Sequence, residues 1–587
     1  MRAAIYLSSL SAFFTNSYAS SESCKAFPGT ASWPREHTWA RFNESTGGKL
    51  IKPTPPGAVC HPGEPTYNAD ECAAVRTAWY TYDFHQRDPI SNMWQQYNND
   101  TCLVEPDTPC SPAGYPAYVV NATCAEDVKL SLEFAHEHNI RVIVKSTGHD
   151  YQGRSAAPGS LSIWIRHMQG PLKTLKSFRP KGCDFTIDTT AVTAAGGTQM
   201  GQLYDDLDLI NQTVVGGGSK SVSVGGYITG GGHSILSPHY GLAADQVLEI
   251  ELVTPQGEIL TANECQNEDL FWAMRGGGGS TFGVMTSITL KTYPTPKIVG
   301  GIAAVATEVG APFLWDMVGY VVSQSPYLLD KGVSGYMFTT TNQSLPVGNS
   351  TINVAGVGGS VIIIGTQELS DLDAIWEPIF TYANKTWGAF PYTSFAAYPS
   401  FKAWYDVYYD QNPAGYDMWV GSHLLDEAAF GNATTLGEVY KISEATAYLV
   451  GGKGVMDAKP SGGSNAVNPS WRRTLVHATN GLAFEPLNKT ARDESLANVN
   501  AITEPLRQLA PDMGAYVNEN NPAEPNWQES FWGSNYVRLL QIKRRVDPHD
   551  VLWCHPCVGN ERWAVQEDYR LCPSGRYYPG AKQSRLT

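Results

Sequence analysis

Three glycine-dense stretches constrain the fold of this chain more than any other feature. They are the polar loop 145–155, the run 216–232, and the run 276–279, which continues to Gly283. Such stretches cannot be helix interiors, where each glycine costs about 0.5–1 kcal/mol relative to alanine. They suit a backbone that approaches a ligand closely or takes positive φ. Because glycine-rich backbone at strand ends offers N–H groups to phosphate, the pattern indicates a nucleotide cofactor.

Several familiar motifs are missing from these stretches. The chain has no G-x-G-x-x-G, which disfavours a Rossmann dinucleotide fold. It has no G-x-x-x-x-G-K-[ST], which excludes a P-loop kinase or ATPase, and no G-x-S-x-G elbow, which weakens the case for an α/β-hydrolase. The formal net charge of −15 argues against nucleic-acid binding and against a polybasic membrane-surface protein. Membrane insertion is not expected either.

Strands and helices are predicted between the loops. Tyr118–Val120 predicts a strand, Thr123 with Glu126 predicts a capping box for the following helix, and 140–144 predicts a second strand. A chain of 587 residues is expected to form two or more lobes, and its composition changes after Pro294. The other predicted elements are strand 247–254, helix 268–275 capped by Asn267, and strand 284–290.

The N-terminus predicts export. Arg2 is followed by an apolar run from Ala3 to Phe14 and by the small-x-small triplet 17–19, which together indicate a signal peptide over 1–19. A buried strand or helix is the alternative. We therefore expect secretion, or residence in the lumen of the secretory or vacuolar system, with N-glycans. Nine sequons occur, at Asn43, Asn99, Asn121, Asn211, Asn342, Asn349, Asn384, Asn432 and Asn488.

Cysteine usage agrees with export. In a secreted chain most of the 11 cysteines are expected to pair, and their odd number leaves one free. Cys554 and Cys557 are predicted to take part in structural disulfides rather than in a redox or zinc motif, because no helix-forming run or second ligand pair follows them. The pairing of the cysteines cannot be read from the sequence. No metal site is predicted. Residues 20–112 are rich in proline, cysteine and tryptophan, and predict an irregular segment tied by disulfides.

Four blocks of the sequence resemble the vanillyl-alcohol-oxidase/p-cresol-methylhydroxylase flavoproteins with a berberine-bridge type of C-terminus. The resemblance implies an α+β fold, with an FAD-binding domain of two α+β subdomains at 113–296. It also implies a substrate domain on a large antiparallel sheet at 297–514. A segment at 515–565 would return to the FAD domain, leaving 566–587 as a tail. The blocks are 144–155, 224–232 with 240–245, 269–283, and 526–536 continuing to Gly559.

The same resemblance implies a covalent flavin. His149 stands where the family carries the histidine joined to the flavin 8α-methyl group; the alternative is a histidine that only hydrogen-bonds phosphate. Ser219 stands where some members carry a cysteine that forms a second bond, so a single histidyl link is expected. Tyr227 replaces a histidine of many plant members and is expected near the ribityl chain or N1. The FAD contacts implied are His149, Ser146, Thr147, Gly148, Asp150, Gly153, Ser155, Ser219, Gly225, Gly226, Tyr227, Gly230, Val284 and Asn535.

Candidates for proton transfer come from the C-terminal block. Many relatives read Tyr-x-Asn-Tyr there, whereas this chain reads Tyr516-Val-Asn-Glu519, so Tyr516 and Glu519 are the catalytic candidates. Their alternatives are a structural tyrosine and a solvated glutamate. Tyr408 and Tyr409 are further candidates for the catalytic base, but tyrosines in such an aromatic run are more often core residues.

The expected function is that of a secreted FAD-dependent oxidase. It would oxidise an alcohol, either a small primary alcohol or a secondary-metabolite intermediate as in mycotoxin pathways, and pass the electrons to oxygen to give hydrogen peroxide. The N-terminal cysteine and proline pattern is most similar to the fungal isoamyl-alcohol-oxidase-like group. Alternatives are an oligosaccharide oxidase, a C–C bond-forming or cyclising oxidase, and a glycosylated surface protein with a degenerate flavin fold.

Overall fold

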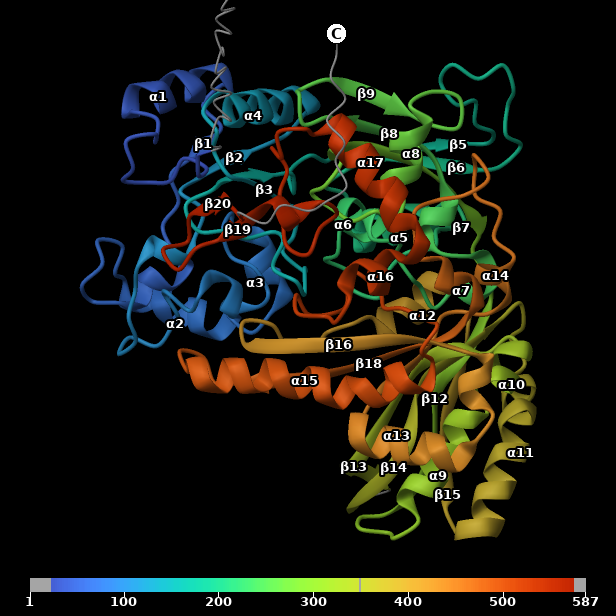
Figure 1. The fold of residues 1–587 in the computed structure, drawn as a ribbon. Helices are drawn as coiled ribbons and strands as arrows, with labels where there is room; N and C mark the ends of the chain where they lie inside the picture. The colour runs from blue at the N-terminus through green and yellow to red at the C-terminus, as the bar shows by residue number, and fades with distance from the viewer. Residues whose placement is uncertain (1–22, 348–349, 575–587) are drawn as a thin grey trace, which may run out of the picture.

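The computed structural model describes residues 23–347 and 350–574. The predicted signal peptide over 1–19, the sequon at Asn349 and the last part of the predicted tail lie outside these residues. Within them the fold contains three main sheets, of four, five and seven strands. Figure 1 shows the first two sheets in the upper part of the molecule and the seven-stranded sheet with its helices in the lower part.

The four-stranded sheet carries the first glycine loop. Its order is β1-β2-β4-β3, with β4 parallel to both β2 and β3 and β1 antiparallel to β2. Helix α4 (Ala125–Glu137) connects β2 to β3 and buries Val128, Leu132 and Ala135 against the sheet, as its helical spacing predicts. Because β3 ends at Lys145, the polar loop begins at the edge of the sheet. The strands are β1 (Leu50–Ile51), β2 (Tyr118–Asn121), β3 (Val142–Lys145) and β4 (Leu161–Trp164).

The predicted cap of α4 is wrong by one residue. Cys124 is the N-cap, and Asp127 rather than Glu126 is the third helical residue. The Asp127 carboxylate accepts the backbone N–H of Thr123 at 2.8 Å and that of Cys124 at 3.3 Å. It also pairs with Lys49 at 2.7 Å, so the helix start is joined to the segment before β1.

The five-stranded antiparallel sheet carries the second and third glycine stretches. Its order is β5-β6-β10-β8-β9, and its buried face joins α5 and α6 in one apolar core. The predicted strands 247–254 and 284–290 and the predicted helix 268–275 correspond to β8, β10 and α8. The elements are β5 (Lys173–Leu175), β6 (Ala191–Ala195), α5 (Met200–Asp208), α6 (Val224–Thr229), β8 (Val247–Val253), β9 (Ile259–Ala262), α8 (Glu268–Ala273), β10 (Val284–Lys291) and α17 (Tyr536–Val546).

A seven-stranded antiparallel sheet forms the lower part, in the order β15-β12-β14-β13-β17-β18-β16. Helix α15 packs along β16 and β18, and α9 packs on α13. This sheet confirms the large antiparallel sheet expected after Pro294. Its elements are β12 (Ile298–Glu308), α9 (Leu314–Ser323), β13 (Ser334–Val347), β14 (Ser350–Ile364), α11 (Leu369–Trp387), β15 (Phe390–Tyr398), β16 (Asp417–Asp426), α13 (Ala433–Ser443), β17 (Thr446–Leu449), β18 (Thr474–Phe484) and α15 (Lys489–Leu509).

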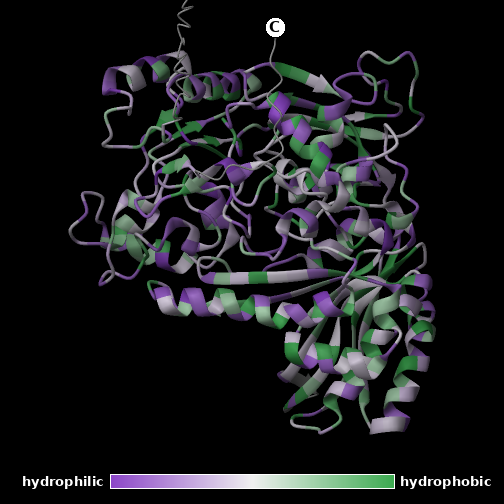
Figure 2. Ribbon diagram, in the orientation of Figure 1, coloured by the Kyte–Doolittle hydropathy of each residue, from purple (hydrophilic) through white to green (hydrophobic). Residues whose placement is uncertain are grey.

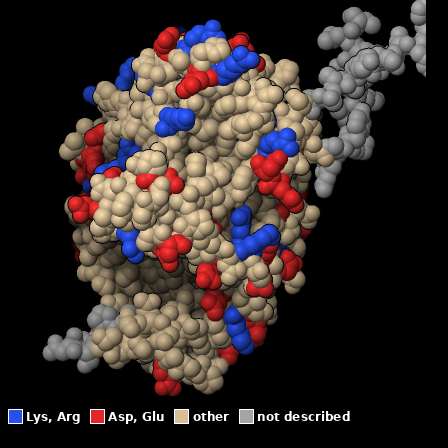
Figure 3. Space-filling model, turned by 90° about the vertical axis from the view of Figure 1, so that its left-hand side faces the viewer, with Lys and Arg blue, Asp and Glu red and all other residues tan. Residues whose placement is uncertain are grey.

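The helices of the lower part are amphipathic, and Figure 2 shows polar and apolar residues alternating along α15. On the face drawn in Figure 3, lysine and arginine are interspersed with aspartate and glutamate rather than gathered in one field. Among the described residues, no helix has both the length and the apolar character needed to cross a bilayer. The other short elements are β7 (Gln212–Thr213), α7 (Ser237–Tyr240), β11 (Tyr293–Pro294), α10 (Ser325–Asp330), α12 (Phe401–Tyr408), α14 (Lys453–Met456), α16 (Trp527–Trp532), β19 (Trp563–Val565) and β20 (Leu571–Pro573).

The N-terminal segment contains more regular structure than its composition predicts. It forms the short helices α1 (Glu36–Ser45), α2 (Ala69–Ala78) and α3 (Tyr82–Arg87), and it supplies β1 to the four-stranded sheet. Their apolar positions are few, which is why the helical period is hard to detect: α2 buries none of its side chains. The segment also contacts the chain just before β16, because Trp79 donates its indole N–H to the Gly415 carbonyl at 2.8 Å.

Ten of the cysteines form five disulfides, and Cys124 is free and exposed. This confirms the expectation that most cysteines pair and one remains free, and that Cys554 and Cys557 are in a disulfide; they bond each other, a pairing that the sequence left open. Cys24 bonds Cys572 across 548 positions, with Cα atoms 4.0 Å apart, so the two ends of the described chain are joined covalently. The pairs are Cys24–Cys572, Cys60–Cys72, Cys102–Cys110, Cys183–Cys265 and Cys554–Cys557.

Candidate active site

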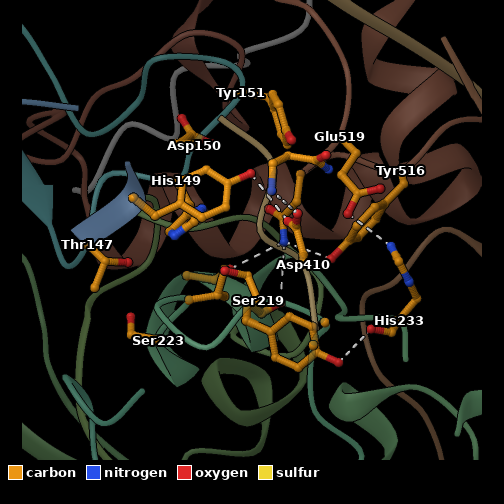
Figure 4. A pocket seen from close by; sticks show the side chains of 18 of the residues that line it. Thr147, His149, Asp150, Tyr151, Ser219, Ser223, His233, Asp410, Tyr516 and Glu519 are labelled. Carbon is orange, nitrogen blue, oxygen red and sulfur yellow. Dashed lines mark hydrogen bonds and ion pairs between the residues drawn. The ribbon is translucent and has the colours of Figure 1, made fainter. Parts of the chain in front are cut away.

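A cavity of about 810 Å³ lies where the glycine loops face the seven-stranded sheet. The loops at 144–155, 216–229 and 279–285 form one wall, and residues of β13, β16, β17 and β18 form the opposite wall. Figure 4 shows Thr147, His149 and Asp150 on one side, Tyr516, Glu519 and His233 on the other, and Asp410 and Ser219 between them.

Most of the residues predicted from the sequence meet in this cavity. Tyr408 and Tyr409, which the sequence predicts to be core residues, line this cavity as well. The predicted residues that line it are Ser146, Thr147, Gly148, His149, Asp150, Ser155, Ser219, Gly225, Gly226, Tyr227, Val284, Tyr516 and Glu519.

Three predicted residues lie outside this wall. A Cβ at Gly153 would meet the Tyr97 ring, and one at Gly230 would meet the Asn518 side chain, so these glycines serve close packing within the protein. Asn535 donates its amide to the Val467 carbonyl at 2.8 Å. Its predicted contact with the flavin stays a prediction.

The glycine wall fits a large flat ligand. A Cβ built at Gly218 or at Gly226 meets no atom within 4 Å, although both glycines line the cavity. A side chain at either position would therefore project into open volume that a cofactor can fill. Ser155, farther along the first loop, is buried with an unpaired hydroxyl oxygen, which leaves a hydrogen-bonding group for a ligand. These features match the polar and phosphate-bearing chemistry of FAD.

His149 lies on the cavity wall after the strand end of β3. Its Nε2 and the Ser221 hydroxyl oxygen are 2.7 Å apart, and the Tyr82 ring lies 4.6 Å from the imidazole, centroid to centroid. Burial, with help from the nearby Lys145 ammonium, lowers the pKa of His149 to about 3. The imidazole is therefore neutral at ordinary pH, with a lone pair on one nitrogen. Its Nδ1 atom has no hydrogen-bond partner among the residues that the structure describes.

Glu519 bridges two histidines at the opposite side of the cavity. Its carboxylate oxygens lie 2.9 Å from Nε2 of His233 and 2.9 Å from Nε2 of His477. Burial opposes the charge, but His233 and His477 outweigh it and hold the pKa of Glu519 well below its usual range. A carboxylate only accepts hydrogen bonds, so both Nε2 atoms carry the hydrogen.

The geometry of this cluster favours hydrogen bonding over metal binding. Among the described residues, the Nδ1 atoms of His233 and His477 are both buried without a hydrogen-bond partner. A metal-bound histidine instead donates its second N–H to an acceptor. Burial lowers the pKa of His477, which keeps that ring neutral beside the Glu519 anion.

Tyr516 lies beside this cluster and is 2% exposed. Its hydroxyl oxygen accepts the Gly232 N–H at 3.1 Å and the Asn518 amide at 2.9 Å. Because both acceptor positions are used, its own hydrogen is free to be donated. Burial, followed by the Glu519 charge, raises the pKa of Tyr516, so the hydroxyl is protonated.

Asp410 is a second cavity carboxylate, which the sequence analysis missed. It follows α12, accepts the Tyr82 hydroxyl at 3.3 Å and the Asn412 N–H at 2.9 Å, and donates its backbone N–H to the Gly218 carbonyl at 2.9 Å. Burial raises the pKa of Asp410, opposite in direction to the shift at Glu519. The cavity thus holds two carboxylates in contrasting environments, a pattern typical of sites of proton transfer.

His233 and His477 were also missed, and the sequence holds only a weak signal for them. His233 directly follows the run Gly230–Gly232, so its place beside a ligand loop could have been noticed. His477 lies inside β18, in a run of consecutive buried residues, so no alternation marks the face of the strand that it occupies. Tyr82 belongs to the N-terminal segment, and nothing local connects it to the glycine loops.

Comparisons with known proteins agree with this site. The family described as FAD binding domain matches residues 116–263, and the family described as Berberine and berberine like matches 515–559. The FAD-linked oxidoreductase apf9 of Gibberella fujikuroi is 34% identical over 583 residues, which cover 94% of this chain and 96% of that protein. The VAO-type flavoprotein oxidase VAO615 of Thermothelomyces thermophilus is 32% identical over 584 residues, covering 95% and 96%.

A solved structure has the same fold over nearly the whole chain. The crystal structure of the VAO-type flavoprotein MtVAO713 from Myceliophthora thermophila C1 superposes with a TM-score of 0.86 at 30% identity, covering 94% of this chain and 100% of that one. The α+β fold, FAD as the cofactor and the oxidoreductase class expected from the sequence are confirmed by these relatives. The chain therefore belongs to the VAO-type family of FAD-linked oxidoreductases, and FAD is its cofactor.

Proposed function

We propose that the protein is an oxidase that converts an alcohol to a carbonyl compound and reduces oxygen to hydrogen peroxide. The observation that carries the proposal is the ionised Glu519, which lies with Tyr516 across the cavity from the glycine loops. A relative named as a flavoprotein oxidase supports the choice of oxygen as acceptor. When bound, FAD supplies the hydride acceptor and the route for electrons to oxygen.

The chain's own residues bind the alcohol and move its proton. Tyr516 donates its free hydrogen to the substrate hydroxyl oxygen, which orients that group in the cavity. Glu519 keeps unused lone pairs on both carboxylate oxygens and accepts the hydroxyl proton as the hydride leaves, because the proton on the developing carbonyl is then acidic enough to pass to a carboxylate of low pKa. His233 and His477 hold the carboxylate in place, so it need not reorganise when the proton arrives.

His149 is proposed to be the covalent tether, with a single link because Ser219 is not a cysteine. His149→Ala tests this link. After acid precipitation of the purified protein, we expect yellow flavin in the pellet of the wild type and in the supernatant of the variant. The His149 position on the wall and its neutral ring support this role. Flavin that stays in the pellet of the variant would contradict the assignment.

The substrate class is tested by oxygen consumption. We expect uptake with small primary alcohols such as isoamyl alcohol or with a larger secondary-metabolite alcohol, and one hydrogen peroxide for each oxygen consumed. Aromatic side chains such as Tyr336, Trp404 and Tyr448 line the cavity and suit an apolar substrate. Turnover of oligosaccharides alone would favour the oligosaccharide oxidase, and reduction of the flavin without oxygen uptake would favour a dehydrogenase.

Secretion with N-glycosylation is part of the proposal. The five disulfides support an oxidising compartment. Mass spectrometry of protein from the culture medium tests it: we expect a mature N-terminus near residue 20 and glycans on exposed sequons such as Asn211.

A further inference from the structure

A chain of hydrogen bonds joins the first glycine loop to the Tyr516 hydroxyl. Arg154 donates from Nη2 to the amide oxygen of Asn518 at 3.1 Å. Asn518 in turn donates from Nδ2 to the Tyr516 hydroxyl oxygen at 2.9 Å. Arg154 and Asn518 both line the cavity, and the function proposed above uses neither of them.

We infer that Asn518, held by Arg154, is the positioning residue of Tyr516, because it turns the hydrogen of the Tyr516 hydroxyl toward the substrate. This inference rests on the proposed function, in which Tyr516 donates that hydrogen to the hydroxyl oxygen of an alcohol. It adds the two residues that decide whether the hydrogen is available.

The orientation of the Asn518 amide is fixed at both of its ends. Arginine only donates hydrogen bonds, so the atom of Asn518 that faces Arg154 is the amide oxygen. Backbone carbonyls only accept, and the amide nitrogen lies 3.4 Å from the Gly226 oxygen and 3.3 Å from the Tyr227 oxygen. A reversed amide would bring two donors together at one end and acceptors together at the other.

Arg154 is itself held by an ion pair with Asp150 of the same loop. Its Nη2 lies 2.5 Å and its Nε 3.0 Å from Oδ1 of Asp150, and only 8% of the Arg154 side chain is exposed. Nη2 carries two hydrogens, so it serves Asp150 and Asn518 at the same time. The ion pair therefore holds a donor in one place beside the Asn518 oxygen.

The fixed amide leaves one direction for the hydrogen of Tyr516. The hydroxyl oxygen accepts from Asn518 and, at 3.1 Å, from the Gly232 N–H. Because two donors approach this oxygen, its own hydrogen points to a third position. No residue that the structure describes accepts that hydrogen, and Tyr516 lines the cavity. A substrate oxygen in the cavity is the acceptor that fits.

The substitution Asn518→Asp tests the direction of these hydrogen bonds. A carboxylate keeps the size of the amide and still accepts from Arg154, but it has no hydrogen to donate. Tyr516 then gives its hydrogen to the new carboxylate instead of to the substrate. Asn518→Ala, by contrast, removes the donor and supplies no competing acceptor. We therefore expect a larger effect from Asn518→Asp, whereas a purely structural role predicts a larger effect from Asn518→Ala, since Asn518 packs directly on Gly230.

The test uses the purified full-length protein with its own FAD. Two quantities are measured: the dissociation constant of tert-amyl alcohol, from the change in flavin absorbance, and kcat/KM for isoamyl alcohol. The tertiary alcohol has no hydrogen on its carbinol carbon, so it binds without being oxidised. In Asn518→Asp we expect the dissociation constant to rise about tenfold, as for the loss of one hydrogen bond, and kcat/KM to fall by at least the same factor.

A double-mutant cycle with Tyr516→Phe separates positioning from a general effect of the new charge. Tyr516→Phe alone should also weaken binding about tenfold. If Asn518 acts through the Tyr516 hydroxyl, adding Asn518→Asp to Tyr516→Phe causes no further loss. An effect of charge or packing would persist without the hydroxyl, and the two losses would multiply.

Arg154→Lys tests the other end of the chain of hydrogen bonds. It keeps a positive charge beside Asp150 but not the planar fork that serves Asp150 and Asn518 together. The Asn518 amide then loses its fixed donor, so we expect weaker binding of tert-amyl alcohol, by a smaller factor than in Asn518→Asp. This variant also carries the test if Asn518→Asp does not fold.

Asn500→Asp is the matched control. Asn500 lies on α15, where its oxygen accepts from Arg507 at 3.3 Å and its nitrogen lies 3.3 Å from the Leu496 carbonyl and 3.4 Å from the Ala523 carbonyl. The amide thus has the same kinds of partner as Asn518, but Asn500 is not among the residues that line the cavity. Its dissociation constant and kcat/KM should be those of the wild type.

The outcomes separate this inference from the proposed function. Wild-type affinity in Asn518→Asp or in Arg154→Lys, a larger loss in Asn518→Ala, or losses that multiply with Tyr516→Phe overturn the inference and leave the alcohol oxidase intact. An equal loss in Asn500→Asp also overturns it. If Tyr516→Phe binds and oxidises the two alcohols as the wild type does, or if the wild type neither binds nor oxidises them, the proposed function fails for small alcohols, and this inference fails with it.

Discussion

Two histidines hold the Glu519 side chain in place and keep it ionised. The substitution Glu519→Gln removes the charge and keeps the size of the side chain. Glu519→Gln keeps the shape but presents an amide N–H₂ to one of two imidazole N–H groups, so one hydrogen bond becomes a donor–donor contact. We expect turnover to fall by about 10²- to 10⁴-fold, the usual contribution of a general base, while bound FAD stays unchanged. Stopped-flow reduction of the flavin by substrate measures this loss.

Asp410→Asn provides the comparison for that experiment. It removes the other cavity carboxylate without touching His233 or His477. If Asp410→Asn slows flavin reduction as much as Glu519→Gln does, the proton acceptor has been assigned to the wrong carboxylate.

The sequence predicts the flavin side of the site better than the substrate side. His149 and its neighbours lie in one continuous loop, so the glycine-rich, polar composition of that loop is enough to predict that they contact a cofactor. Glu519 could be predicted as a departure from a local motif, but its partners His233 and His477 come from 286 and 42 positions away. Only the packed fold brings these three side chains together, because no local pattern encodes contacts between distant strands.

At the scale of elements, strand β16 begins with a buried aspartate, Asp417, which lies beside the carboxylate of Asp100 from the N-terminal segment. Asp417 is 1% exposed, and its carboxyl group interacts with the side chain of Asp100. Burial and the neighbouring Asp100 carboxylate raise the pKa of Asp417 to about 8. Because the unfolded value is near 4, the folded protein binds this proton more tightly. The contribution to stability is therefore present at low pH and is lost as pH rises toward 8.

Asp417→Asn should remove this pH dependence. We expect the free energy of unfolding at pH 8 to rise by about 1–3 kcal/mol, the usual cost of an unmatched buried polar group, with little change at pH 4. Chemical denaturation at the two pH values measures the effect. Asp426→Asn, at the other end of β16, is the control; an equal gain there would mean that the pair with Asp100 is not the cause.

Element boundaries show where local patterns stop being informative. The strand predicted at 284–290 is nearly the observed β10, although the strand is buried on both faces and its burial does not follow the alternation of the sequence. The cap of α4 shifted from Thr123 to Cys124 because Asp127 is held by Lys49, a contact from outside the helix. The strand order of the seven-stranded sheet could not be predicted, because the spacing of apolar residues indicates that a segment is a strand but not which strands pair with each other.

At the scale of the whole molecule, the Cys24–Cys572 bond should dominate the effect of the disulfides on stability. Replacing both cysteines by serine opens a loop of 548 positions, whereas the matched pair Cys60–Cys72 closes one of 12. In chain entropy the long loop is worth about 3 kcal/mol more. Thermal and denaturant unfolding of the two double variants measures the difference. Equal losses would indicate that local packing, not loop closure, sets the effect.

The same bond gives the described chain the connectivity of a closed ring. With residues 24 and 572 joined, every backbone position between them lies on a loop that has no free end. A protease that cuts one surface loop therefore leaves a nicked protein whose two pieces stay covalently attached. The pieces separate only after reduction, so an enzyme of this architecture keeps its mass through a first proteolytic cut.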